Sequence, residues 1–179
     1  MDEAGRRFEQ LVMPHLGAAF NLARWLTRND HDAQDIVQDA SLRAFRYLDA
    51  LRGDDARAWL LGIVRNTTWS WLQANRPSEL STREDDGELQ IPAPSSDEPE
   101  TSAVRRAEAR LLNEAIAALP PPLREVIVLR ELEDLSYRQI AQIADIPIGT
   151  VMSRLSRGRR LLAQSVKVIE AAADRQGAR

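Results

Sequence analysis

The chain has 179 residues, no cysteine, two histidines and a formal net charge of −3. This length suits one domain of ordinary size or two small ones. Disulfides and thiolate metal sites are excluded, and His15 and His31 lie too far apart to suggest a metal centre, so we expect no metal and no cofactor. No apolar run approaches the ~20 residues of a membrane span and no signal peptide precedes the first helix, so we expect a cytoplasmic protein without membrane insertion.

The first 76 residues have the apolar spacing of helices throughout. A stripe that begins at Phe8 continues to Leu26, and Pro14 marks a boundary or kink within it. Asp30 or Asp32 is expected to cap the next helix. The inward positions of that helix and the turn after it are Ile36, Val37, Ala40, Ala44, Leu48 and Leu51.

A turn at positions 52–55 follows, and Asp54 or Asp55 then starts a long helix that ends near position 75. Trp69 and Trp71 in this helix could stack on unpaired bases. Their spacing of two places them on different sides of the helix, so one of them is expected to be part of the core.

Residues 77–101 contain four prolines and eight acidic side chains against one arginine, without helical periodicity, which is typical of a mobile acidic linker. Helix is expected again from Ser102 to Leu119, and another from Leu123 to Leu132 with Val126, Ile127 and Leu129 inward. The chain is therefore predicted to be all-α, with two small helical domains (1–76 and 102–179) joined by a flexible linker (77–101).

The stretch 135–162 carries the clearest motif. Ser136 and Gln139 have the spacing of a capping box, and Leu135 can pack on Ile140 as a hydrophobic staple. A short apolar stripe follows until an Asp-Ile-Pro sequence interrupts it, since the residue before a proline is biased away from helix. Two short helices joined by a tight turn predict a helix-turn-helix, which places its second helix in the major groove of DNA.

In that second helix Val151, Leu155, Gly158 and Leu162 share one face, which we expect to be inward. Residues 149–169 contain four arginines, one lysine and no acidic side chain. Small outward residues allow a close approach to DNA, where arginine pairs with guanine edges or phosphates. The alternative is the solvated basic face of an ordinary helical hairpin.

Five sequence motifs follow one another in the order known from one protein family, and they are spread over nearly the whole chain. They are Asp32–Asp39 (DAQDIVQD), Leu51–Asp54 (LRGD), Trp59–Thr67 (WLLGIVRNT), Leu129–Tyr137 (LRELEDLSY) and Pro147–Leu155 (PIGTVMSRL). In this order the chain resembles the extracytoplasmic-function (ECF) group of bacterial sigma-70-type RNA polymerase sigma factors. The resemblance implies a non-enzymatic subunit that directs core RNA polymerase to promoters.

The resemblance also implies partners for each domain. The first domain, region 2, would bind the β′ clamp helices of polymerase and open the −10 element of promoter DNA. The second, region 4, would bind the β flap and recognise the −35 element. Members of this group are commonly held inactive by an anti-sigma factor, so such a partner is expected here.

Carried over position by position, the resemblance assigns side chains to each surface. Asp35, Gln38, Asp39 and Arg43 match the polymerase-binding positions, although exposed acidic side chains can equally be a solvated helix face. Arg52, Gly53 and Asn66 match the −10 region, and Asn66 could instead be an asparagine bonded within its helix. The −35 positions are Thr150, Met152, Ser153, Arg154, Ser156, Arg157 and Arg160.

Within the −35 set we expect different roles. Arg157 is the best candidate for a direct base contact, whereas Arg154, Arg159 and Arg160 are expected to hold phosphates. Met152 stands where some members place arginine, and it offers apolar contact with a thymine methyl but no bidentate hydrogen bonds.

Two other classes of function were compared. A classical regulator would bind a palindromic operator by itself, but no dimerisation helix is evident in the sequence. A small helical enzyme such as a nuclease would need convergent carboxylates, histidines or a metal site, and the sequence offers no such constellation.

Overall fold

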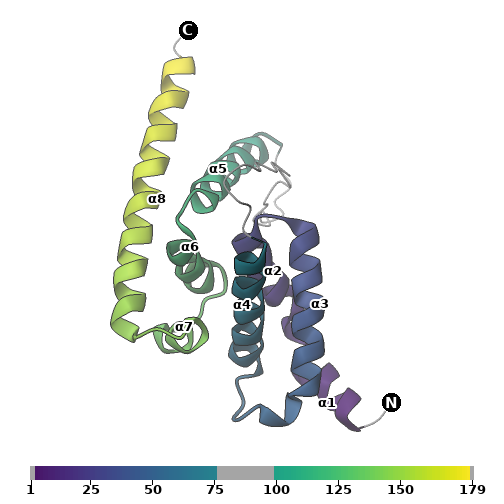
Figure 1. The fold of residues 1–179 in the computed structure, drawn as a ribbon. Helices are drawn as coiled ribbons and strands as arrows, with labels where there is room; N and C mark the ends of the chain where they lie inside the picture. Colours follow the sequence, from purple (N-terminus) through teal and green to yellow (C-terminus); the bar gives the residue numbers. More distant parts are fainter. Residues whose placement is uncertain (1–2, 76–98, 178–179) are drawn as a thin grey trace.

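The computed structural model describes residues 3–75 and 99–177, and every regular element in these segments is a helix, which confirms the all-α prediction (Figure 1). The predicted linker falls outside the described residues up to position 98. No helix in the described segments has the length and apolar character needed to span a bilayer. The N-terminal half contains α1 (Glu3–Leu11), η1 (Met13–His15), α2 (Leu16–Thr27), α3 (Asp30–Arg46), η2 (Leu48–Ala50) and α4 (Ala56–Ala74). The C-terminal half contains α5 (Pro99–Ala117), α6 (Pro121–Ile127), η3 (Val128–Leu132), α7 (Tyr137–Ala144) and α8 (Ile148–Gly177).

Helices α2, α3 and α4 pack on one another to form the N-terminal half. The α3 helix is capped by Asn29, whose side chain accepts from the Asp32 amide at 2.9 Å. The prediction of Asp30 or Asp32 as the cap was wrong, because both already lie in the first helical turn, where a negative charge favours the positive end of the helix dipole. The α4 helix is capped by Asp55, one of the two predicted residues, which accepts from the Ala58 amide at 2.9 Å.

The predicted helix from Leu123 to Leu132 forms, but its second part widens into the π-helical turn η3. The Glu133 amide donates to the Val128 carbonyl five residues earlier, at 3.1 Å, which is the bond that defines such a turn. The predicted inward residues Val126, Ile127 and Leu129 are fully buried.

The two halves pack against each other and share one buried apolar cluster. Helix α4 contacts α7, and α2 contacts α6 and η3. Arg124 bridges the halves, because its guanidinium donates to the Trp25 carbonyl at 3.0 Å and to the Leu119 carbonyl at 2.8 Å. Burial lowers the pKa of Arg124 to about 10, so it remains protonated at neutral pH. The two predicted helical domains are both present, and the described residues show in addition that they pack against each other.

Candidate functional site

Helices α7 and α8 form the predicted helix-turn-helix. The Ser136 hydroxyl accepts from the Gln139 amide at 3.2 Å and the Gln139 side chain accepts from the Ser136 amide at 2.8 Å, which confirms the capping box. Helix α7 ends at Asp145, whose φ of 52° is left-handed. This lets the Ile146 amide donate to the Ala141 carbonyl at 3.1 Å, the bond of a Schellman motif. The turn is therefore fixed by local hydrogen bonds.

The inward face of α8 is as predicted. Val151 and Leu155 are buried, and Gly158 is buried against α6. A Cβ atom on Gly158 would lie 2.8 Å from Cγ1 of Ile127, closer than two carbon atoms approach without strain. Glycine at this position allows α8 to pack close to α6, which fixes the face of α8 that points outward.

That outward face carries most of the predicted −35 residues. Thr150 and Arg154 are half-buried at its edge, and the Ser153 hydroxyl donates to the Thr150 carbonyl at 3.0 Å. Exposed to solvent are Met152, Ser153, Ser156, Arg157 and Arg160.

Arg159, expected to hold a phosphate, is engaged within the C-terminal half. Its Nε and Nη2 atoms donate to one carboxylate oxygen of Glu131 at 2.9 and 2.7 Å. These bonds raise the pKa of Arg159 above its ordinary value. In the described residues no side chain is paired with Arg157 or Arg160, so these two arginines remain available to a ligand.

The −10 candidates do not gather into one cluster. Arg52 and Gly53 are exposed in the turn before α4, where the φ of 79° at Gly53 needs a residue without a Cβ. Asn66 is exposed ten residues beyond the start of α4 at Ala56, about 15 Å further along the axis. Its side-chain oxygen accepts from Arg65 at 3.3 Å, and its amide nitrogen bonds to no other described residue.

The candidate polymerase-binding residues do lie together. Asp35, Gln38, Asp39 and Arg43 are all exposed, and their spacing of three and four residues places them along one side of α3. Arg43 pairs with Asp39 at 3.0 Å, and His31 approaches Asp35 at 3.3 Å. The structure thus presents a polar stripe of both charge signs.

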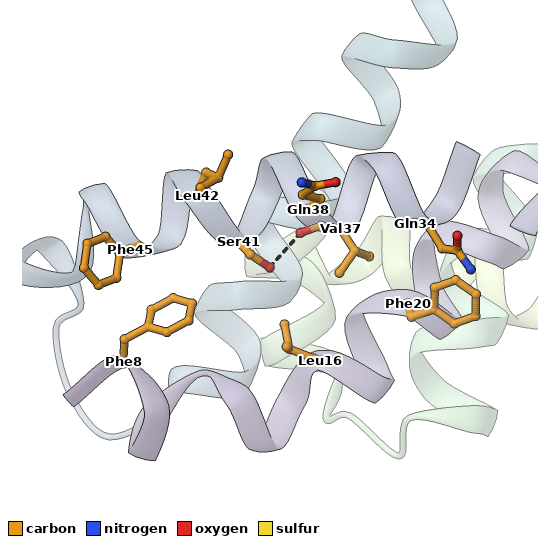
Figure 2. A pocket seen from close by; sticks show the side chains of 9 residues that line it. All are labelled: Phe8, Leu16, Phe20, Gln34, Val37, Gln38, Ser41, Leu42 and Phe45. Atoms are coloured by element: carbon orange, nitrogen blue, oxygen red, sulfur yellow. Dashed lines mark hydrogen bonds between the residues drawn. The ribbon is translucent and has the colours of Figure 1, made fainter. Parts of the chain in front are cut away.

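An apolar groove of about 520 Å³ lies directly beside this stripe, between α1, α2 and α3 (Figure 2). Gln38 belongs to both surfaces. Leu42 and Phe45 remain 63% and 45% exposed, which is unusual for side chains of this size. The Phe8 and Phe45 rings meet edge to face with centroids 5.4 Å apart. The groove is lined by Phe8, Leu16, Phe20, Gln34, Val37, Gln38, Ser41, Leu42 and Phe45.

Polar contacts between the two halves were not predicted. Glu125 of α6 is fully buried, and its Oε1 atom accepts from Arg65 Nε and Trp69 Nε1 of α4, both at 2.8 Å. The Arg65 guanidinium also lies over the Trp69 ring, 5.7 Å from its centroid. Trp71 is partly buried and packs against the apolar cluster, without belonging to its fully buried members.

A second buried carboxylate lies further along the same interface. Glu133 is 8% exposed and accepts from Asn21 of α2 at 2.5 Å and from Arg57 of α4 at 2.6 Å. Next to it Gln139 donates to Asp55 at 2.6 Å, and this bond lowers the pKa of Asp55. The capping residue of the helix-turn-helix therefore touches the turn that carries two −10 candidates.

The only signal in the sequence for these contacts is weak. Arg124 and Glu125 interrupt an otherwise apolar run, and every residue from Leu123 to Leu129 is buried. A charged pair inside a helix that is buried all round needs partners from other elements, since buried charges are rarely left unpaired.

Within the two described segments, no group of three or more His, Cys, Asp or Glu side chains could hold a metal ion.

Comparison with known proteins gives consistent matches. The model of Sigma-70 region 2 matches residues 11–77, and that of Sigma-70 region 4 matches residues 109–162. The ECF RNA polymerase sigma-E factor of Haemophilus influenzae is 35% identical over 152 residues, covering 82% of this chain and 79% of that protein. The RNA polymerase sigma-H factor of Pseudomonas aeruginosa is 32% identical over 168 residues, covering 90% and 87%. Among solved structures, the sigma factor RpoE in complex with the anti-sigma factor NepR from Bartonella quintana has a TM-score of 0.68 at 26% identity, covering 90% of this chain and 97% of that one.

Proposed function

Because this chain belongs to the ECF group of sigma-70-type RNA polymerase sigma factors, which are non-enzymatic transcription initiation factors, we propose which of its side chains bind polymerase and which recognise the promoter. Region 2 spans residues 1–76 and region 4 spans residues 102–179, with 77–101 connecting them. The protein acts in the cytoplasm, where core RNA polymerase and promoter DNA are found.

The outward face of α8 contacts the −35 element. Arg157 donates to a base edge, Arg154 and Arg160 hold phosphates, and the small side chains of Ser153 and Ser156 let the helix backbone approach the groove floor. The observation that supports this assignment is the open, unpaired state of Arg157 and Arg160 beside the engaged Arg159. Thr150 and Met152 complete the contact at the start of the helix.

The test of the −35 assignment compares two arginines of the same helix. Arg157→Ala is expected to cost ~1–3 kcal/mol on the preferred −35 duplex and to relax preference at one base pair. Arg160→Ala, the matched control, should weaken binding on all sequences alike and reduce the salt dependence. Equal weakening of every sequence by Arg157→Ala would instead make Arg157 a phosphate contact.

The polar stripe of α3 and the adjacent apolar groove form the surface for core polymerase. A helical partner can place apolar side chains in the groove while its basic residues pair with Asp35 and Asp39. Gln38 and Arg43 lie beside these two carboxylates and contact the same partner. Arg52, Gly53 and Asn66 contact the −10 strand. A base edge can pair with the Asn66 amide once the base is flipped out of the duplex.

Two measurements test this surface. Purified chain and core polymerase should give promoter-selective transcripts from a pool of genomic fragments; the absence of any selective transcript would refute the assignment. Asp35→Asn with Asp39→Asn should weaken polymerase binding by about fivefold or more, since two exposed ion pairs worth ~0.5–1 kcal/mol each are lost. Asp49→Asn, a solvent-exposed carboxylate paired with Arg7, is the matched control and should bind normally.

An anti-sigma factor is a further proposed partner. The RpoE structure named above contains one, and the groove of α1, α2 and α3 offers an apolar surface for which such a partner would compete with polymerase. This is tested by pull-down with the product of a neighbouring gene in the presence and absence of core polymerase.

A further inference from the structure

We propose that one side of α8, formed by Ile148 and Met152, selects −35 elements by the C5-methyl groups of two thymines. These two side chains are called the apolar flank below. The inference rests on the proposed function, because it names bases that the same DNA-binding face prefers.

Both side chains of the apolar flank are exposed although they are large. In the described part of the C-terminal half, the exposed large apolar side chains are Leu112 of α5 at 38%, Ile148 at 48% and Met152 at 54%. Ile148 and Met152 belong neither to the buried cluster nor to the apolar side chains packed on it. A single exposed apolar residue is ordinary at a surface, but these two lie within the first five residues of α8 and form one patch.

The patch lies at the part of α8 that comes nearest to the bases. In a helix-turn-helix the N-terminal residues of the second helix contact base edges. The spacing of four residues places Ile148 and Met152 on the same side of α8, about 6 Å apart along its axis. Arg157 lies about 140° around the helix from Met152, with the exposed small residues Gly149 and Ser153 between them. The DNA-facing surface of α8 therefore has one apolar edge and one basic edge.

Along residues 148–159, no open cation lies on the apolar flank. Arg159 is on the same side of α8, about two turns beyond Met152. Its guanidinium is held by Glu131, to which it donates twice, at 2.9 and 2.7 Å. This edge of the helix therefore offers a base apolar contact without a hydrogen-bond donor.

The chemistry of the major groove matches such an edge to thymine. Thymine presents a methyl group there, whereas guanine, adenine and cytosine present polar groups that an alkyl or thioether side chain leaves unpaired. Successive bases of one strand are about 3.4 Å apart along the helix axis of DNA. Two side chains about 6 Å apart can therefore contact thymines that are one or two base pairs apart.

The test removes methyl groups without changing base pairing. The full chain bound to core polymerase first selects promoters from a pool with a random −35 region. Each thymine of the selected element is then replaced singly by deoxyuridine, which lacks only the C5-methyl group, and the affinity of the holoenzyme is measured by competition. The same duplexes are bound by the Ile148→Ala and Met152→Ala variants, in which exposed positions receive the best helix-forming residue.

Two thymines are expected at which deoxyuridine weakens binding by the wild-type chain about threefold each, as the loss of one buried methyl group predicts. At one of them the effect should vanish in Met152→Ala, and at the other in Ile148→Ala. Leu112→Ala is the matched control, since it shortens an exposed apolar side chain of α5 in the same half, and it should keep both effects.

The inference is overturned if no thymine responds to deoxyuridine. It is also overturned if the Ile148 and Met152 variants lose affinity but keep the full methyl effects, which is the result expected for a flank that contacts protein. A selected element that depends on Arg157 without any methyl effect would refute this inference and leave the −35 assignment intact. A holoenzyme that selects no −35 sequence would refute both.

Discussion

The packing of α8 on α6 gives the sharpest energetic prediction, at Gly158. A Cβ atom there would lie 2.8 Å from Cγ1 and 3.1 Å from Cδ1 of Ile127, whose side chain is fully buried and cannot swing into solvent. Favourable carbon contacts lie near ~3.5–4.0 Å, so Gly158→Ala overpacks the contact, which typically costs ~1–3 kcal/mol. Alanine gains ~1 kcal/mol of helix propensity over glycine. With the contact shortened by nearly 1 Å, the packing cost is expected to exceed this gain, for a net loss of up to ~2 kcal/mol in the free energy of unfolding.

The reasoning is tested by a double-mutant cycle with Ile127→Ala. That substitution removes both clashing carbon atoms, so on its background Gly158→Ala should stabilise the protein by up to ~1 kcal/mol, and the sign of the effect reverses. Free energies are measured by urea unfolding followed by circular dichroism. Gly62→Ala in α4 is the matched control, because a Cβ there meets nothing within 4 Å, and it should be neutral or stabilising. A stabilising Gly158→Ala on the wild-type background, or an equal effect on both backgrounds, would refute the argument.

Two further predictions concern the ends of helices. Ser136→Ala removes half of the capping box of α7 and should lower the free energy of unfolding by ~1 kcal/mol. The control is Ser70→Ala at an exposed mid-helix position of α4, which should not lower this free energy. Equal effects at the two serines would contradict the role of the cap. The hydrogen bond from Gln139 lowers the folded pKa of Asp55, so its carboxylate contributes stability that is fully present above the unfolded pKa and is lost as the pH falls through the folded value. Between about pH 5 and 3 the wild-type chain should therefore lose stability relative to Asp55→Asn, which can still cap α4 but does not titrate, and a constant difference over this range would contradict the assignment.

The elements that sequence could predict are those decided by neighbours in the chain. The capping box at Ser136, the proline break before α8 and the inward face with Gly158 all depend on residues within about four positions of each other. The cap of α3 shows the limit of such rules. Asn29, Asp30 and Asp32 can all cap a helix, so the pattern predicts a start in this segment without choosing its register.

The contact between the halves could not be predicted in the same way. Glu125 bonds to a residue 60 positions away and Glu133 to residues 76 and 112 positions away, so no periodicity marks them. Glutamate is also among the side chains least often buried, and a pattern reading places it outward by default. The resemblance to sigma factors assigned each half its partners, but a family motif carries no information on how two halves pack.

Helix α8 combines features that depend on neighbouring residues in the chain with features that depend on contacts from distant elements. Sequence places four arginines on a basic helix but cannot tell which of them are free, because that depends on a carboxylate from another element. Glu131 of the π-helical turn η3 engages Arg159 with two hydrogen bonds, and Arg154 is half-buried at the edge of the face. Arg157 and Arg160 are exposed and unpaired, and they lie almost one helical turn apart. Since a base edge and a phosphate lie at different depths of a groove, we expect the arginine nearer the small serines, Arg157, to reach the base and Arg160 to meet the backbone. The turn η3 thus removes Arg159 from the arginines that are open on this face, and it is followed by Glu133, which accepts a hydrogen bond from Arg57 of α4. One irregular turn therefore bears both on the proposed −35 face of α8 and on the contact between the two halves.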